Sequence, residues 1–275
     1  MPFRRSCFRS ARYCDAPVRA QGVVGAAGTG PPAGPVLEVT PRATSRTRAP
    51  TRSLPAQRGS SLDPYRGGTL IQDRKLRWPV RSREVLGTGR VSSFVNEVVE
   101  TPDGQVMDRQ FLTHPGAVAV VPWDEQRDQI AVLRQYRHPV GMELVEIPAG
   151  LLDEPGEDWL RAAERELAEE SELGAARWDV LVDMCTTPGA CEESLRIYLA
   201  RGLAHTPRPD GFVLADEEAQ MTTAFVPRQD LVDAALAGRV QSPTLVAGIL
   251  ALETARLSGR LETLRGVDAP WPVRR

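Results

Sequence analysis

The chain of 275 residues is long enough to form one or two domains around a sizeable hydrophobic core. It contains 34 basic and 36 acidic residues, but residues 1–60 hold ten arginines and two acids, so the remainder carries 24 basic and 34 acidic residues and is about ten units negative. That acidity argues against nucleic acid as the main ligand, and no run of 18 apolar residues could span a membrane, so we expect a soluble protein.

Residues 1–66 are rich in Arg, Pro, Gly, Ser, Thr and Ala and show almost no apolar periodicity. Such a segment cannot bury enough surface to offset the entropy lost on ordering, so we predict a disordered tail. An Arg-rich, acid-poor start is also typical of an organelle transit peptide, whereas a solvated tail or a wrongly assigned start codon explains the same composition. We assign the tail no function.

The four cysteines do not form a metal-binding or disulfide pattern. Cys7, Cys14, Cys185 and Cys191 show no CxxC spacing, and the three histidines of the chain form no cluster. These features favour a reduced, zinc-free, cytoplasmic protein.

Short β-like runs separated by turns follow the tail. The run RVSSFVNEVVE (90–100) is followed by Pro102, Asp103 and Gly104, which favour a turn, and then by VMDRQFLT (106–113), so we predict a hairpin. Further strands are predicted on both sides of an acidic segment. Their ranges are 116–123, 129–136, 142–147, 179–185, 194–200 and 222–227.

Three segments have helical patterns. The first runs from about Asp158 to Leu173 and is expected to end at Gly174. The second is 228–238, and the third, 242–259, begins with a capping Ser and a Pro. The apolar stripe of the third helix consists of Leu245, Ile249, Leu252 and Ala255. Strands, a helix, more strands and two closing helices predict an α/β sandwich with a mixed sheet.

The first helix belongs to an acidic segment, residues 148–175, which contains nine carboxylates. At 100° per residue, Glu166, Glu169 and Glu170 share one side, and like charges at this spacing each destabilise a bare helix by roughly 0.2–0.5 kcal/mol. The opposite side carries the apolar residues Leu160, Ala163 and Leu167. Another interaction must therefore offset the repulsion.

Two features favour a metal site over a solvated face with Arg161 and Arg165 as partners. The segment IPAG (147–150) brings backbone carbonyls to the start of the acidic segment, and the two arginines serve six glutamates from Glu157 to Glu172. Oxygen-rich, lysine-free surroundings suit a hard divalent cation, and Mg²⁺ is held by one or two carboxylates together with water and substrate phosphate oxygens.

This segment resembles the sequence box of the Nudix hydrolase family, which reads Gly, five residues, Glu, seven residues, then Arg-Glu-hydrophobic-x-Glu-Glu-x-Gly-hydrophobic. Here six residues separate Gly150 from Glu157, seven more follow, and the remainder is RELAEESEL (165–173). The extra residue falls in a turn, where an insertion costs little. Glu172 stands where the family has Gly, and Gly174 is the candidate for the helix exit instead.

The resemblance implies a Nudix-type α/β/α sandwich over residues 67–275, with 67–115 as an N-terminal β region and 116–275 as the catalytic sandwich. It also implies Mg²⁺ as cofactor, with Mn²⁺ as an alternative. The implied metal ligands are Glu166, Glu170, the assisting Glu169 and the carbonyl of Ala149. Glu157 would pair with Arg165 and orient the helix, or would be a cap or a surface acid.

Sequence outside the box resembles the ADP-ribose pyrophosphatase branch of the family, over residues 85–256. LRQYRHPVGMELVEIPAG contains Gln135, Arg137 and Glu146 of the branch pattern. TTPGACEES resembles its Ser-Pro-Gly-x-x-x-Glu segment, with Glu193 in the Glu position.

Each of these residues has a functional and an ordinary interpretation. Arg137 is expected to bind a phosphate through its paired donors, or to form a surface salt bridge. Glu146 would accept from a ribose or adenine donor and Glu193 would support metal or substrate, unless both are solvated carboxylates. Arg109, on the hairpin, is a weaker candidate for substrate contact.

The base for hydrolysis usually comes, in this branch, from a late loop outside the box. FVLADEEAQM (212–221) lies at the matching distance and offers Asp216, Glu217 and Glu218, of which Glu217 aligns best. Because metal ions acidify bound water, such a carboxylate needs little elevation of its pKa. An acidic solvent loop is the alternative.

The resemblance as a whole implies Mg²⁺-dependent hydrolysis of ADP-ribose, a small nucleoside diphosphate, to AMP and ribose 5-phosphate. It also implies a homodimer whose amino-terminal hairpins cross to the partner. Alternative substrates are a nucleotide sugar, a dinucleotide or an oxidised nucleoside triphosphate. A non-catalytic module that senses ADP-ribose is a further alternative, although such a module would be expected to lose box carboxylates, which are intact here.

Overall fold

The computed structural model describes residues 71–212 and 220–274. The tail expected to be disordered, 1–66, lies outside these residues, and the boundary expected at residue 67 stays a prediction. The candidate bases Asp216, Glu217 and Glu218 lie outside them too. Across the described ranges, no helix is both long and apolar enough to cross a membrane.

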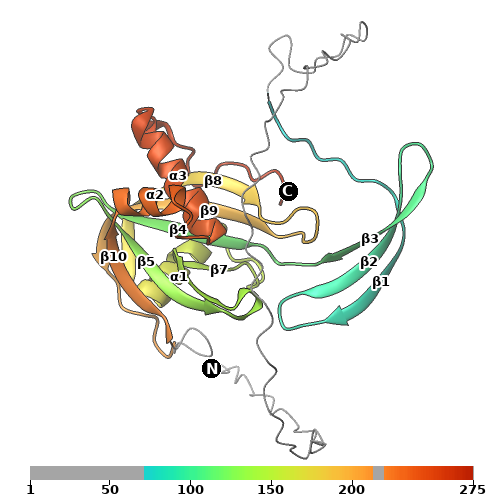
Figure 1. Cartoon of the computed structure of the whole chain (residues 1–275), viewed down its shortest axis with the longest axis horizontal. Coiled ribbons are helices and arrows are strands. Elements are labelled where there is room, and N and C mark those ends of the chain that lie inside the picture. Colours follow the sequence, from blue (N-terminus) through green and yellow to red (C-terminus); the bar gives the residue numbers. More distant parts are fainter. Residues whose placement is uncertain (1–70, 213–219, 275) are drawn as a thin grey trace, which may run out of the picture. The chain divides into compact units, whose positions relative to one another are not determined.

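An antiparallel sheet of three strands comes first in the described chain (Figure 1). Its strands are β1 (Val80–Thr88), β2 (Ser93–Glu100) and β3 (Val106–Leu112). The predicted hairpin is formed by β2 and β3, and its turn is closed by a hydrogen bond from the N–H of Thr101 to the carbonyl of Gln105 (2.8 Å). The sequence pattern does not predict β1, because all nine of its residues are exposed and no buried alternation marks the strand.

A mixed sheet of seven strands follows, which confirms the predicted α/β fold. Its hydrogen-bonded order is β10-β5-β4-β9-β8, with β6 paired to β5 and β7 paired to β4; only the β4–β9 pair among these is parallel. The strands are β4 (Ala117–Asp124), β5 (Gln129–Arg137), β6 (Met142–Glu146), β7 (Ala149–Leu151), β8 (Leu173–Cys185), β9 (Ser194–His205) and β10 (Thr222–Pro227).

One edge of β4 is shared by two strands. Residues Ala117–Ala119 pair with β7, whereas Trp123 and Asp124 pair with β5. The other edge of β4 pairs with β9 along nearly the whole length of β4. β5 and β7 therefore pair with different parts of the same edge of β4. The short strand β7 is thereby held inside the sheet just before the acidic helix begins.

Helices pack on both faces of the mixed sheet. They are α1 (Trp159–Ser171), α2 (Arg228–Leu236) and α3 (Pro243–Leu257), and short 3-10 turns span His138–Val140 and Leu261–Thr263. Along β4, Val118 and Val120 belong to the core beneath α1, whereas Ala119 and Val121 belong to the core beneath α3, because side chains alternate between the faces of a strand. Helices α2 and α3 lie side by side (Figure 1). The stripe predicted for α3 (Leu245, Ile249, Leu252 and Ala255) is buried.

The end of α1 corrects one expectation. The helix begins after Asp158, whose carboxylate accepts a hydrogen bond from the N–H of Leu160 (2.9 Å) and so acts as the N-cap. The residue that leaves the helix in the left-handed conformation is Glu172 (φ 56°, ψ 35°). The expectation that Gly174 forms the exit is therefore wrong, because Gly174 already belongs to β8.

Candidate functional site

The acidic face of α1 contacts β7 through Glu170. The Oε2 atom of Glu170 accepts a hydrogen bond from the N–H of Ala149 (2.9 Å), and Glu170 is buried. In the antiparallel pairing of β4 with β7, Ala149 lies opposite Ala119. The neighbouring pair is hydrogen-bonded, from the N–H of Val120 to the carbonyl of Pro148 (2.8 Å), so the Ala119–Ala149 pair is not. The N–H of Ala149 therefore points away from β4 and can bond to Glu170. The carbonyl of Ala149 points to the same side as its N–H, away from β4.

Gly150 brings a second box glutamate against the same strand. A Cβ atom at this position would overlap the carboxyl group of Glu166, so any other residue would push that side chain aside. The glycine is therefore required by close approach of a side chain and not by a positive φ. Glu166 and Glu170, one turn apart on α1, both lie against β7.

Arg165 holds the remaining carboxylates of this face. It donates to Glu157 through Nε and Nη2 (both 3.0 Å), and its Nη1 atom contacts Glu166 (2.6 Å) and Glu169 (3.1 Å). The pKa of Arg165 is raised above its ordinary value, mainly by hydrogen bonds to Glu157 and then by the charge of Glu166, although burial acts in the opposite direction. The repulsion expected on this helix face is thus partly offset by one guanidinium.

The donors at this place suit a hard divalent cation. Glu166, Glu169 and Glu170 supply carboxylate oxygens on the last two turns of α1, and strand geometry turns the Ala149 carbonyl to the same edge of β7 as the N–H that bonds to Glu170. Among the residues that the structure describes, no three His, Cys, Asp or Glu side chains converge as a metal cluster, and Arg165 contacts both Glu166 and Glu169. A cation bound here would share these oxygens with Arg165 or displace its contacts.

The two substrate residues expected near β5 and β6 contact each other. Arg137 donates to Glu146 through Nε (2.9 Å) and Nη2 (2.6 Å). Glu146 is buried, whereas the Arg137 side chain is 44% exposed, so the guanidinium can still reach a ligand. The structure therefore shows the salt bridge of Arg137, whereas phosphate binding by its guanidinium stays a prediction.

The other two expected substrate residues lie elsewhere. Arg109, on β3, donates to the carbonyl of Asp108 in its own strand (2.8 Å), so the structure does not bring it to the α1 carboxylates. Glu193 accepts a short hydrogen bond from Thr186 and lies 3.7 Å from Nε2 of His114. His114 thus joins Glu193 to the segment that precedes β4.

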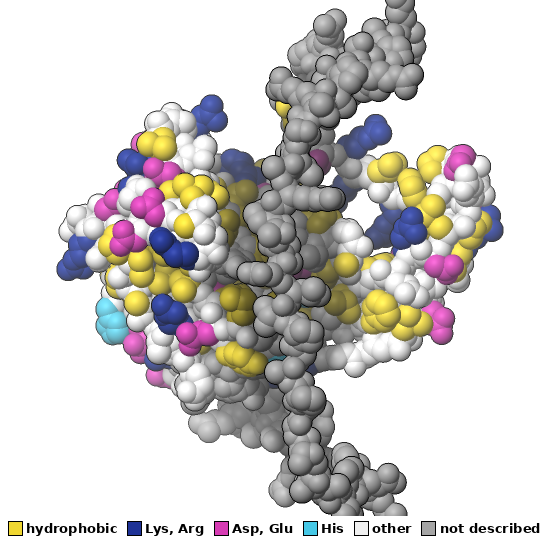
Figure 2. Space-filling view, viewed as in Figure 1, with side chains coloured by type: hydrophobic (Ala, Val, Ile, Leu, Met, Phe, Trp, Pro, Cys, Tyr) yellow, Lys and Arg dark blue, Asp and Glu magenta, His cyan; other side chains and the backbone are white. Residues whose placement is uncertain are grey.

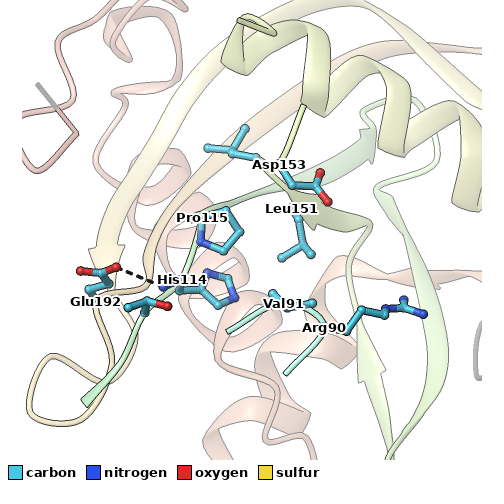
Figure 3. Close-up of a pocket in the computed structure, with 9 residues that line it drawn as sticks. Arg90, Val91, His114, Pro115, Leu151, Asp153 and Glu192 are labelled. Atoms are coloured by element: carbon cyan, nitrogen blue, oxygen red, sulfur yellow. Dashed lines mark hydrogen bonds between the residues drawn. The ribbon is translucent and has the colours of Figure 1, made fainter. Parts of the chain in front are cut away.

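A pocket of about 460 Å³ opens next to this histidine (Figure 3). Its lining combines charged and apolar side chains from the β1–β2 turn, the segment before β4, the end of β7 and the loop before β9. The lining residues are Arg90, Val91, Thr113, His114, Pro115, Leu151, Leu152, Asp153 and Glu192. Glu192 accepts a hydrogen bond from the N–H of His114 (3.3 Å), which closes one side of the pocket. Volumes of this size are typical of small-molecule sites.

Sequence reasoning missed Arg208, which contacts the end of α1. Its Nε atom donates to the carbonyl of Glu169 (2.7 Å) and its Nη1 atom to the carboxylate of Glu172 (3.0 Å). The partners lie 39 and 36 residues away in the chain, so no local pattern signals them. The nearest signal is the substitution of Glu172 for the Gly of the box.

Comparison with known proteins now decides the family. A family model described as NUDIX domain matches residues 113–246. The chain is also 41% identical over 190 residues to an ADP-ribose pyrophosphatase of Mycobacterium tuberculosis, a match that covers 69% of this chain and 89% of that protein. The chain belongs to the Nudix hydrolase family.

Two further similarities accompany this assignment. The Nudix chain is 36% identical over 123 residues to an ADP-ribose pyrophosphatase of Bacillus subtilis, which covers 45% of this chain and 65% of that protein. A crystal structure of an ADP compounds hydrolase matches with a TM-score of 0.56 at 20% identity, over 69% of this chain and all of that one. At that identity the structural match shows the Nudix fold alone.

Proposed function

We propose that this Nudix hydrolase cleaves the pyrophosphate bond of ADP-ribose and releases AMP and ribose 5-phosphate. The observation that carries the proposal is the placement of Glu170 against Ala149 and of Glu166 against Gly150, which puts two carboxylates of α1 beside the same short strand. The identity to two proteins named ADP-ribose pyrophosphatase supports the choice of substrate.

We propose Mg²⁺ as the cofactor, with Mn²⁺ as a substitute. Its ligands would be Glu166 and Glu170, assisted by Glu169, together with the carbonyl of Ala149. When bound, such an ion neutralises diphosphate charge and acidifies water. In this proposal Arg165, held by Glu157, bridges Glu166 and Glu169 and offsets their charge until the cation binds.

The chain's own residues perform the remaining steps of the proposed reaction. Arg137, oriented by the buried Glu146, binds a phosphate oxygen of the substrate. Glu217, with Glu218 and Asp216 as alternatives, accepts a proton from the attacking water. At the same time the oxygen of the water bonds to one phosphorus, and the P–O bond between that phosphorus and the bridging oxygen breaks. Glu193 keeps its role as a candidate substrate or metal contact, and Arg109 stays the weaker candidate.

The pocket beside β7 is proposed to receive the part of the substrate beyond the diphosphate. Leu151 and Asp153 in its wall directly follow Ala149 and Gly150, and the carboxylates of Asp153 and Glu192 can accept from ribose hydroxyls. Replacing Asp153 with Ala should raise KM for ADP-ribose several-fold, on the scale of one lost hydrogen bond, with kcat little changed. An unchanged KM would remove the pocket from the proposal.

We also propose that the protein is a cytoplasmic homodimer that acts on a small molecule and not on nucleic acid. Figure 2 shows hydrophobic side chains on the three-stranded sheet, and the exposed ones include Val80, Val85, Leu86, Phe94 and Val106. A sheet with so much exposed apolar surface favours association with a second copy. Sedimentation of the protein and of Val85→Glu tests this, because a dimer should weaken in the variant and a monomer should be unaffected.

The deciding experiment is turnover of ADP-ribose with Mg²⁺, followed by release of AMP. A parallel panel of a nucleotide sugar, a dinucleotide and an oxidised nucleoside triphosphate tests the substrate. Cleavage of another member of the panel in preference to ADP-ribose would overturn the substrate alone. Tight binding of ADP-ribose without cleavage would instead identify a sensing module.

A further inference from the structure

Two of the proposed metal ligands lie in the last turn of α1, where the helix has the fewest hydrogen bonds of its own. The last four carbonyls of an α-helix have no partner within the helix, so the final turn frays unless other groups bind them. In α1 that turn carries Glu169 and Glu170. A shift of this turn would move Glu170 away from Ala149 and Glu169 away from Arg165.

Groups distant in the chain bind these carbonyls. Arg208 donates from Nε to the carbonyl of Glu169 (2.7 Å), and Thr223 of β10 donates to the carbonyl of Glu170 (3.4 Å). The N–H of Thr206 donates to the carbonyl of Glu172 (2.9 Å). The positive charge of the Arg208 guanidinium is also favourable here, because the C-terminal end of a helix carries partial negative charge.

The exit residue makes this support necessary. Glu172 adopts φ 56°, a left-handed conformation that a side chain with a Cβ resists and that glycine accepts. Its carboxylate forms an ion pair with Nη1 of Arg208 (3.0 Å), and its N–H donates to the carbonyl of Ala168 (3.0 Å). Arg208 therefore bonds to the helix end and to the strained residue at the same time.

We propose that Arg208 is a positioning residue that fixes the last turn of α1, so that Glu169 and Glu170 are held ready for the divalent cation, and that it compensates for Glu172 in place of glycine. This inference rests on the proposed metal site. Both glutamates are buried, so their placement depends on the helix backbone more than on free side-chain motion. The Arg208 side chain is 33% exposed, so it lies at the surface and outside the hydrophobic core.

The test is a titration of metal-free protein with Mn²⁺, with free Mn²⁺ measured by electron paramagnetic resonance, together with the thermal midpoint of each variant. We expect Arg208→Ala to raise the Kd for Mn²⁺ about tenfold, the scale of a lost supporting contact to a metal ligand. Arg208→Lys should have a smaller effect, because one ammonium cannot replace both bonds. The matched control is Arg161→Ala, which removes an exposed arginine from the same helix and should leave the Kd unchanged.

The double variant Arg208→Ala, Glu172→Gly separates positioning from general stability. Glycine at position 172 removes the strain, so the Kd should return toward the value of the unaltered protein. A lower thermal midpoint in Arg208→Ala with an unchanged Kd would show a merely structural role and overturn the inference. If that variant does not fold, an unchanged Kd in Arg208→Lys overturns it equally. Absence of Mn²⁺ binding by the unaltered protein would overturn the metal site itself and this inference with it.

Discussion

Glu170 accepts a hydrogen bond from the backbone N–H of Ala149 across 21 residues of chain, and this bond (2.9 Å) ties the acidic helix α1 to the short strand β7. It explains how several carboxylates can share one helix face without driving the helix away from the sheet. In the proposed metal site this bond fixes one of the carboxylate ligands beside β7.

Replacing Glu170 with Gln should abolish most activity while the fold is retained. The Gln carbonyl oxygen can still accept from Ala149 N–H, but it lacks the negative charge that a divalent cation requires, so turnover of ADP-ribose should fall by about 100-fold or more. Steady-state kinetics and a thermal melt measure the two effects. Glu164→Gln, on the same helix and paired with Arg161, is the control and should retain normal turnover. Equal turnover in the Glu170 variant and the unaltered protein would refute the metal assignment.

Gly150→Ala should act on the same site without changing any charge. The added Cβ would overlap the carboxyl group of Glu166, so Glu166 must move away from β7. We expect Mn²⁺ affinity to fall about tenfold and the free energy of unfolding to change little, because the overlapping atoms belong to the far end of a flexible side chain. Gly87→Ala is the control, because no atom lies within 4 Å of the position of its added Cβ. If both variants bind Mn²⁺ normally, Glu166 does not need its place beside Gly150.

Glu146 is predicted to affect substrate binding by orienting Arg137, and a double variant can distinguish this role from direct contact between Glu146 and the substrate. If Glu146 only orients the guanidinium, Glu146→Gln should raise KM for ADP-ribose, whereas in an Arg137→Met background the same change should add little. Urea unfolding of the two single variants and the double variant should give a coupling free energy of about 1 kcal/mol, discounted because Arg137 is half exposed. Additive effects on KM would indicate that Glu146 contacts the substrate independently.

The sequence predicts those features whose determinants are local. A continuous apolar run marks β4, and Ser242 followed by a Pro marks the start of α3, which begins at Pro243, although the Ser242 hydroxyl bonds to Thr244 and makes no capping hydrogen bond. The order of residues in the box places Glu166 and Glu170 on one helix face. These patterns concern neighbours within a turn or a strand, where spacing alone decides which side chains face the core.

Contacts between distant segments could not be predicted in this way. The pairing of Arg137 with Glu146 depends on the register of β5 and β6, and the bond from Arg208 to Glu169 depends on how the segment after β9 returns to α1. The sequence predicts that α1 ends at Gly174, because glycine is the residue that most often adopts the left-handed conformation. In the structure Glu172 adopts it instead, and contacts with distant residues such as Arg208 outweigh the preference for glycine. β1 gave no signal because its side chains are exposed on both faces.

The last prediction concerns acid stability and arises where α2 begins. Asp128 accepts two hydrogen bonds from the buried Arg228, at 2.9 and 3.0 Å, and these bonds hold the pKa of Asp128 below its ordinary value of 3.8. Since the pKa is lower in the folded than in the unfolded protein, the pair stabilises the fold fully above about pH 4, and the contribution is lost as pH falls through the folded value.

Asp128→Asn should therefore destabilise the protein at pH 7 by about 1 kcal/mol, a figure reduced for the exposure of the carboxylate. Asn tolerates the positive φ of 51° at this position and can still accept the hydrogen bond from Trp123, so the change removes mainly the charge. Urea unfolding at a series of pH values measures the difference from the unaltered protein. That difference should begin to shrink below about pH 4, where Asp128 of the unfolded chain takes up a proton, and should be lost as pH falls through the lower pKa of the folded protein. A difference that stays constant down to pH 3 would show that the charge of Asp128 contributes nothing and that the loss arises from packing.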